Sequence, residues 1–183
     1  MRALLDRLYA AGLALSAAGF AAIALLVLAQ IAGRLIDRAA RLIGATPPGL
    51  TVPSLAEIGG FVFVGAVFLG LAGTLSNGGH VRVTLLTGRL DAHTRRKLGA
   101  LVSLTAAGLA GFATWSSALQ TLDSWRFGSV SYGMIPIPLW LPQGVMSAGL
   151  ALFCVGLLDA AVTALSGHMP AHERAEAARE TLQ

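Results

Sequence analysis

Residues that could do chemistry are sparse in this 183-residue chain, and most of them lie outside its long apolar stretches. The four histidines fall between apolar runs or near the C-terminus, so none is placed to bind haem inside a helical core. Cys154 is the single cysteine and has no clustered ligand with which to bind a metal. No nucleophile has an accompanying base, and no glycine-rich loop could cradle a phosphate. The sequence therefore predicts a protein that is not an enzyme and needs no cofactor or metal.

Glu57 is the acidic residue with the clearest local pattern. Ser54 precedes it by three residues, the spacing of a capping box, in which the serine side chain accepts a hydrogen bond from the Glu57 amide. A carboxylate there would also be stabilised by the positive end of the helix dipole. A second role stays open, in which Glu57 lies near a membrane surface and pairs with a partner subunit.

Composition and hydropathy predict an integral membrane protein. Hydrophobic residues make up 55% of the chain and charged residues 12%, which is too apolar for an ordinary soluble domain. The basic residues form short clusters between apolar runs, so nucleic acid is not an expected partner. Four runs are long enough to cross a bilayer as helices, at approximately residues 8–33, 55–77, 98–122 and 139–159. We therefore expect an all-α, four-span helical bundle that forms one membrane domain over residues 1–183.

The distribution of lysine and arginine predicts how the spans are oriented. Nine basic residues lie on the face that holds both termini and the loop after the second span, and four lie on the opposite face. Because basic loops are retained in the cytoplasm, both termini, including the tail at 167–183, should be cytoplasmic. On the opposite side, Arg34, Arg38 and Arg41 share one helical face. This pattern predicts an amphipathic helix that lies in the interface after the first span.

Small and polar residues inside the spans indicate helix packing. No span carries an ionisable residue near its middle, which disfavours a carrier that acts alone. Small residues recur every fourth position in the third span and predict a stripe where another helix approaches closely: Gly99, Ser103, Ala107 and Gly111. The pattern leaves open whether that helix belongs to this chain or to a different protein. Trp140 lies near a predicted span end, where tryptophan anchors at the headgroups.

Two stretches, together with Glu57, carry a family resemblance. The first follows the second span and reads Gly-Gly-His-Val-Arg-Val-Thr, with His80 and Arg82 at its centre. The second opens the fourth span and reads Ile-Pro-Ile-Pro-Leu-Trp-Leu-Pro-Gln, with Pro138, Trp140 and Gln143 as its distinctive residues. In this combination the chain resembles the small membrane subunit of tripartite ATP-independent periplasmic (TRAP) transporters, the DctQ-like family. Thr84 departs from the family pattern, which usually has aspartate there.

The resemblance implies a location, partners and a role. The expected location is the bacterial inner (cytoplasmic) membrane, and the expected partners are a large polytopic membrane subunit and a periplasmic substrate-binding protein. The resemblance implies that this subunit holds the large one in the bilayer and helps receive the binding protein during sodium-coupled uptake of organic acids. Two alternatives remain from the residues alone: a small homo-oligomeric carrier or channel that uses Glu57, and a membrane anchor for a redox or enzyme complex.

Overall fold

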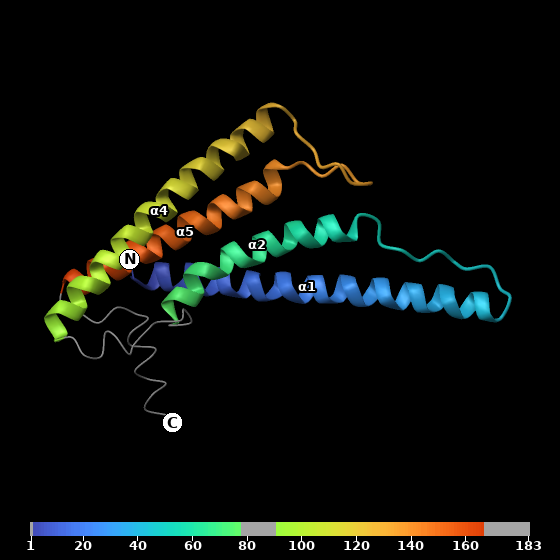
Figure 1. Cartoon of the computed structure of the whole chain (residues 1–183), viewed down its shortest axis with the longest axis horizontal. Coiled ribbons are helices and arrows are strands. Elements are labelled where there is room, and N and C mark those ends of the chain that lie inside the picture. Colours follow the sequence, from blue (N-terminus) through green and yellow to red (C-terminus); the bar gives the residue numbers. More distant parts are fainter. Residues whose placement is uncertain (1, 78–90, 167–183) are drawn as a thin grey trace, which may run out of the picture.

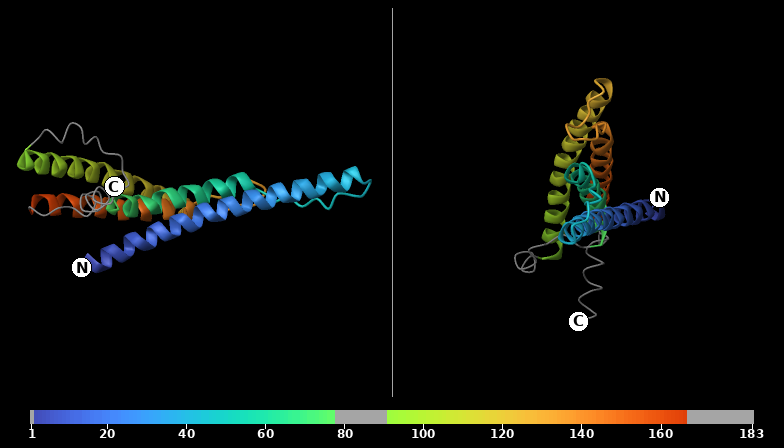
Figure 2. Two further views of the ribbon diagram at one scale, coloured as in Figure 1. Left: turned by 90° about the horizontal axis from the view of Figure 1, so that it is seen from below. Right: turned by 90° about the vertical axis from the view of Figure 1, so that its right-hand side faces the viewer.

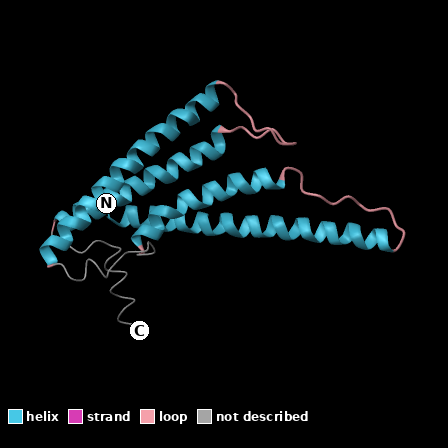
Figure 3. Cartoon of the chain, in the orientation of Figure 1, coloured by secondary structure: helices cyan, strands magenta, loops and turns pink. Residues whose placement is uncertain are grey.

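Four long helices make up most of the computed structural model, which describes residues 2–77 and 91–166 (Figure 1). They are α1 (Arg2–Leu42), α2 (Leu55–Ser76), α4 (Ala92–Arg126) and α5 (Trp140–Leu165). Each one is long and apolar enough to cross a membrane. The all-α, four-span architecture expected from the sequence is therefore confirmed. The loops that join α1 to α2 and α4 to α5 lie toward the same end of the molecule (Figure 3).

Helix α1 is much longer than the predicted first span. Its 41 residues extend about 62 Å, roughly twice the thickness of the hydrocarbon core. The expectation of a separate interfacial helix is corrected, because the three arginines lie exposed on the last turns of α1 itself: Arg34, Arg38 and Arg41. Alanine, leucine and arginine all favour a helix, so these charges end the apolar run without ending the helix. The helix stops where Gly44 takes a φ of +74° shortly before two prolines.

Residues 43–54, which we call the strap, connect α1 to α2 and lie beside the end of α1 (Figure 1). Two side chains of α1 accept hydrogen bonds from strap amides. Asp37 Oδ1 accepts from Gly49 at 2.9 Å, and Gln30 Oε1 accepts from Val52 at 2.7 Å. Asp37 is only 7% exposed, because the strap covers it. Asp37 and Gln30 therefore hold the strap against α1.

The helices are arranged side by side in the order α1, α2, α5, α4, each packed mainly on its neighbours in that order (Figure 2). This arrangement places the four helices in a single layer. Glycines set the close approaches within it. A methyl group on Gly12 of α1 would lie 2.7 Å from the Leu69 carbonyl oxygen of α2, and one on Gly149 of α5 would lie 2.6 Å from the Phe68 carbonyl. Such contacts leave no room for a larger side chain.

The α4–α5 pair forms the other half of the layer. Ala107 and Ala110 of α4 pack with Leu157 of α5 in a small apolar cluster. The Cys154 thiol donates to the Ala107 carbonyl oxygen at 3.4 Å, so this cysteine packs between the two helices. Both helices extend beyond their predicted limits of 98–122 and 139–159 by between one and two turns at one or both ends.

Asp91 caps the start of α4. Its carboxylate accepts hydrogen bonds from the amides of His93 and Thr94, each at 3.1 Å. Hydrogen bonds from Thr94, first from its side chain and then from its amide, hold the pKa of the Asp91 carboxyl below its ordinary value. The ionised carboxylate therefore stabilises the first turn of this helix.

Candidate functional site at the junction of the two hairpins

The α1–α2 hairpin and the α4–α5 hairpin are joined by hydrogen bonds at the start of α2. Glu57 Oε1 accepts from the Gly133 amide at 3.2 Å, and Ser54 Oγ accepts from the Ile135 amide at 3.2 Å. We call these four residues the latch. They join segments 76 and 81 residues apart in the sequence. The latch therefore connects the two halves of the layer.

The latch replaces the capping box that the Ser54–Glu57 spacing predicts. Ser54 stands at the N-cap of α2 with a φ of +54°, in the left-handed region, and its side chain makes no capping hydrogen bond. The amide of Glu57 instead bonds to the Ser54 carbonyl oxygen at 3.1 Å. Both side chains are thus free to accept hydrogen bonds from the loop before α5. A left-handed conformation at a serine is uncommon and costs free energy, which the two latch bonds offset.

Gly133 permits the latch because it has no side chain. A methyl group built on Gly133 would overlap the Glu57 carboxylate at Oε2 and would lie 2.9 Å from Ser54 Oγ. Oε2 itself is buried and has no hydrogen-bond partner among the described residues. The sequence analysis did not single out Gly133. The sequence gives one signal for this residue, which is a glycine between two large side chains shortly before the proline-containing stretch that opens the fourth span.

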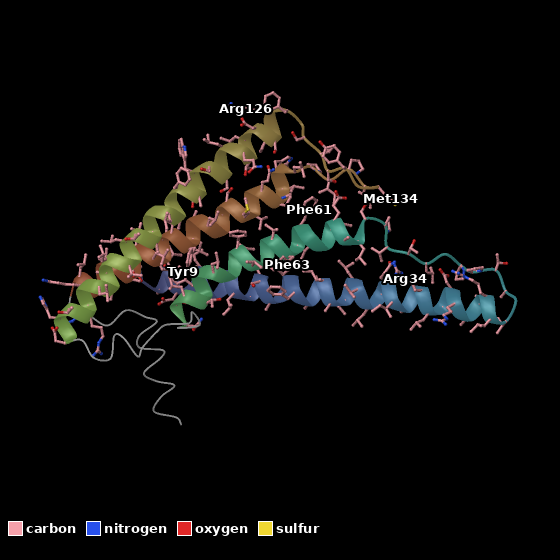
Figure 4. All side chains as sticks on the ribbon, viewed as in Figure 1. Tyr9, Arg34, Phe61, Phe63, Arg126 and Met134 are labelled. Carbon is pink, nitrogen blue, oxygen red and sulfur yellow. The ribbon has the colours of Figure 1, made fainter. Side chains whose placement is uncertain are left out.

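The loop at 127–139 is held in shape by its own hydrogen bonds. Val130 pairs with Pro138 in an isolated antiparallel contact, and the Leu139 amide donates to the Ser129 carbonyl oxygen at 3.0 Å. Ser131 is 7% exposed, and its hydroxyl accepts from the Ile137 amide at 3.1 Å. Met134 stands at the tip of this loop, near the start of α2 (Figure 4). These bonds fix the backbone of the loop, including the amides that donate the latch hydrogen bonds.

Trp140 and Gln143 lie where the motif passes into α5. Trp140 begins the helix and packs against Trp125 of α4, with ring centroids 5.2 Å apart. Gln143 lies one turn later and is half-buried, and its Oε1 is buried without a hydrogen-bond partner among the described residues. Beside it, the Ser147 hydroxyl donates to Ser117 Oγ at 2.9 Å, which joins α5 to α4. The motif thus fixes the α4–α5 hairpin at its loop end.

A protein-family model matches the part of the chain that contains most of these features. Residues 23–167 match the family model described as tripartite ATP-independent periplasmic transporters, DctQ component. The chain belongs to the DctQ family. The match includes the strap, the latch and all of α2, α4 and α5. No curated protein and no solved structure matched the chain. The chain is accordingly a small membrane component of a TRAP transporter and a multi-pass protein of the inner membrane.

Not every residue singled out in the sequence lies in the described part of this DctQ-family subunit. His80, Arg82 and Thr84 fall outside the described residues. In the third-span stripe, Ser103 and Ala107 are buried, Ala107 packs on α5, and a methyl group on Gly111 would lie 3.7 Å from the Cys154 sulfur. A methyl group on Gly99 would meet no atom within 4 Å. Most of the stripe therefore packs inside this chain.

The geometry of this DctQ-family subunit is suited to structural contacts. In the latch, the Glu57 carboxylate and the Ser54 hydroxyl accept hydrogen bonds from backbone amides. Among the described residues, no group of three or more histidine, cysteine or acidic side chains could hold a metal ion. The geometry provides a hydrogen-bonded connection between the two hairpins, and an end of α1 with three exposed arginines, of which Arg34 is labelled in Figure 4.

Proposed function

We propose that this chain is the non-catalytic scaffold of a sodium-coupled TRAP transporter for organic acids. It holds the large transport subunit in position in the bilayer and helps to dock the periplasmic substrate-binding protein. The observation that carries the proposal is the thin, open layer of helices. Such a layer has two broad apolar faces and a small interior of its own, so it needs a partner to complete its packing.

Burial within the chain supports a role that depends on a partner. In the most apolar window of each span, only 11% to 28% of the residues are buried. The buried apolar residues are mostly alanines, and no large side chain among the described residues is fully buried. Helices in membranes associate through close packing and hydrogen bonds, because lipid provides little hydrophobic driving force between them. A large subunit that packs on the layer would supply the missing contacts.

The ends of the helices support an orientation in the membrane. The predicted cytoplasmic face holds both termini, so we assign the strap and the loop at 127–139 to the periplasm. Tyr132 and Met134 at the loop tip are 103% and 85% exposed. The exposed arginines at the end of α1 lie toward the same end of the molecule, so this end presents both apolar and positively charged side chains. We assign this surface to the docking of the binding protein.

Reconstitution tests the proposed function directly. The chain is purified with an affinity tag after co-expression with a large TRAP membrane subunit from the same genome, and both are placed in vesicles with a periplasmic substrate-binding protein of the same system. We expect the tag to recover the large subunit, and organic-acid uptake to require a sodium gradient and all three proteins. Substituting the three arginines at the end of α1 with glutamine should weaken stimulation by the binding protein and leave recovery of the large subunit unchanged.

A different result would identify the homo-oligomeric alternative. Vesicles that contain this chain alone would then take up solute, and Glu57→Gln would abolish the uptake. The contact between Glu57 and the Gly133 amide favours a structural role for this acid. Uptake by the chain alone, or failure to recover a large polytopic partner under any mild detergent, would overturn the scaffold proposal.

A further inference from the structure

Polar side chains in the spans of α1, α2 and α5 are turned inward or satisfied within their own helix. In α1, Tyr9 and Ser16 are 5% and 6% exposed, and every exposed residue from Leu8 to Ala29 is apolar. Thr74 of α2 donates to the Gly70 carbonyl oxygen at 2.8 Å. The exposed residues of α5 from Leu141 to Leu165 are also all apolar. In these spans the exposed surfaces therefore offer no hydrogen-bonding side chain to a neighbouring helix.

Helix α4 differs, because it exposes polar side chains along its span. Ser116, Gln120 and Asp123 are exposed and follow one another at intervals of four and three residues, so they lie within one narrow strip of the helix. The side chains of Ser116 and Gln120 make no hydrogen bond within the described part of the chain. Two large apolar residues continue the strip: Leu109, 67% exposed, and Phe112, 72% exposed. We call these five residues the α4 outer face.

This face points away from the rest of the layer. The residues of α4 that pack on α5 include Ala107, Ala110 and Ser117, which lie about 100° to 180° around the helix from the centre of the strip, at 100° per residue. Helix α4 is the last helix of the layer, and α5 is its main neighbour (Figure 1). Nothing else in the described chain covers the α4 outer face.

The polar side chains of the α4 outer face lie too deep in the membrane for lipid to satisfy their hydrogen bonds. The packed pair of Trp125 and Trp140 marks the level of the headgroups at this end of the hairpin. Gln120 and Ser116 lie five and nine residues before Trp125, which places them about 7.5 Å and 13.5 Å deeper along the helix. Half of the hydrocarbon core is about 15 Å thick, so both side chains lie within it on the periplasmic half of the span. A glutamine in that region needs hydrogen-bond partners from protein.

We infer that the α4 outer face binds a transmembrane helix of the large transport subunit, one that offers hydrogen-bonding side chains to Ser116 and Gln120. This inference rests on the proposed function and names the surface through which it operates. A second copy of this chain fits the face less well. Two copies inserted with the same orientation would set each Asp123 at the same depth as its counterpart, and like charges repel there. A helix of a different protein avoids this repulsion, because it need not carry an acid opposite Asp123.

Site-specific photocrosslinking in the intact complex tests the inference. Benzoyl-phenylalanine replaces Phe112 or Gln120 in the tagged chain, co-expressed with the large subunit. The matched control places it at Leu25, a 67% exposed residue of α1 at the other edge of the layer. We expect adducts with the large subunit from positions 112 and 120, in at least about tenfold higher yield than from position 25. The double variant S116L/Q120L should recover about fivefold to tenfold less large subunit, since two interhelical hydrogen bonds are lost.

The other outcomes would overturn the inference. Adducts between two copies of this chain from positions 112 and 120 would overturn the inference in favour of self-association. Adducts with lipid alone, or equal yields from positions 25 and 112, would overturn it while recovery of the large subunit by the tag leaves the scaffold proposal standing. If the unsubstituted chain recovers no large subunit, the proposed function fails first and this inference fails with it.

Discussion

Replacing Gly133 with alanine should open the latch that joins the two hairpins. The added methyl group would occupy the space of the Glu57 carboxylate and press on Ser54 Oγ, so the carboxylate has to leave. Glu57 then loses its hydrogen bond to the loop. A hydrogen bond to a charged group contributes about 1.5 to 3 kcal/mol, and partial exposure puts this one at the lower end. With crowding against Ser54 included, we expect G133A to cost about 2 kcal/mol.

The companion variants follow from the same contacts. Glu57→Ala should cost about 1.5 kcal/mol, and Ser54→Ala, which loses a neutral hydrogen bond, about 1 kcal/mol. The variant E57A/G133A should be no less stable than G133A, because the methyl group has already displaced the carboxylate. This amounts to a coupling energy of about 1.5 kcal/mol between the two positions.

The measurement is equilibrium unfolding in mixed micelles, with increasing fractions of denaturing detergent and helix content followed by circular dichroism. Gly60→Ala is the matched control: Gly60 lies on the first turns of α2, and a methyl group there meets nothing within 4 Å. That variant should be neutral or more stable by up to about 1 kcal/mol. If G133A proves as stable as G60A, or if the costs of E57A and G133A simply add, the latch does not hold the hairpins together.

Three further predictions concern other parts of the layer. Gly149→Val should separate α5 from α2 and lower stability by about 2 to 3 kcal/mol in the same assay, and an unchanged midpoint would contradict the close approach there. Gln30→Ala should speed hydrogen exchange at the Val52 amide at least fivefold, equivalent to about 1 kcal/mol, and unchanged exchange would mean that the strap is held otherwise. Because its folded pKa is lowered, Asp91 should stabilise the start of α4 above its ordinary pKa, and the effect should disappear as pH falls through the folded value. After correction for the intrinsic rate, hydrogen exchange at the Thr94 amide of the unsubstituted chain should therefore become faster as Asp91 is protonated at acidic pH. In D91A the corrected exchange rate should not change over the same pH range.

The number and type of the helices could be predicted because the sequence encodes them locally. Long runs of apolar residues can only be helices in lipid, and the four runs identify four helices. The helix ends were less predictable, because hydropathy reports where lipid ends and not where a helix ends. Helix α1 shows the difference: it continues through Arg34 and Arg41 and stops only near Gly44.

Contacts between distant segments were beyond the sequence. The Ser54–Glu57 pair has the local spacing of a capping box, yet both side chains bond to a loop more than 70 residues away. Nothing in the spacing distinguishes these two uses, since the same oxygens accept hydrogen bonds in each. The order of the helices in the layer depends on which small residues meet, such as Gly12 with α2 and Gly149 with α2. A small residue permits close packing but does not determine which helix packs against it.

The unequal lengths of neighbouring helices determine how the subunit responds to bilayer thickness. Helix α2 has 22 residues, about 33 Å, and so exceeds a 30 Å hydrocarbon core by less than one turn. Helix α1 has nearly twice that length and can change which of its turns meets the headgroups. In a thicker membrane, mismatch strain would therefore fall on α2, while α1 adapts without it. Lipid composition could thereby alter the angle between the two helices.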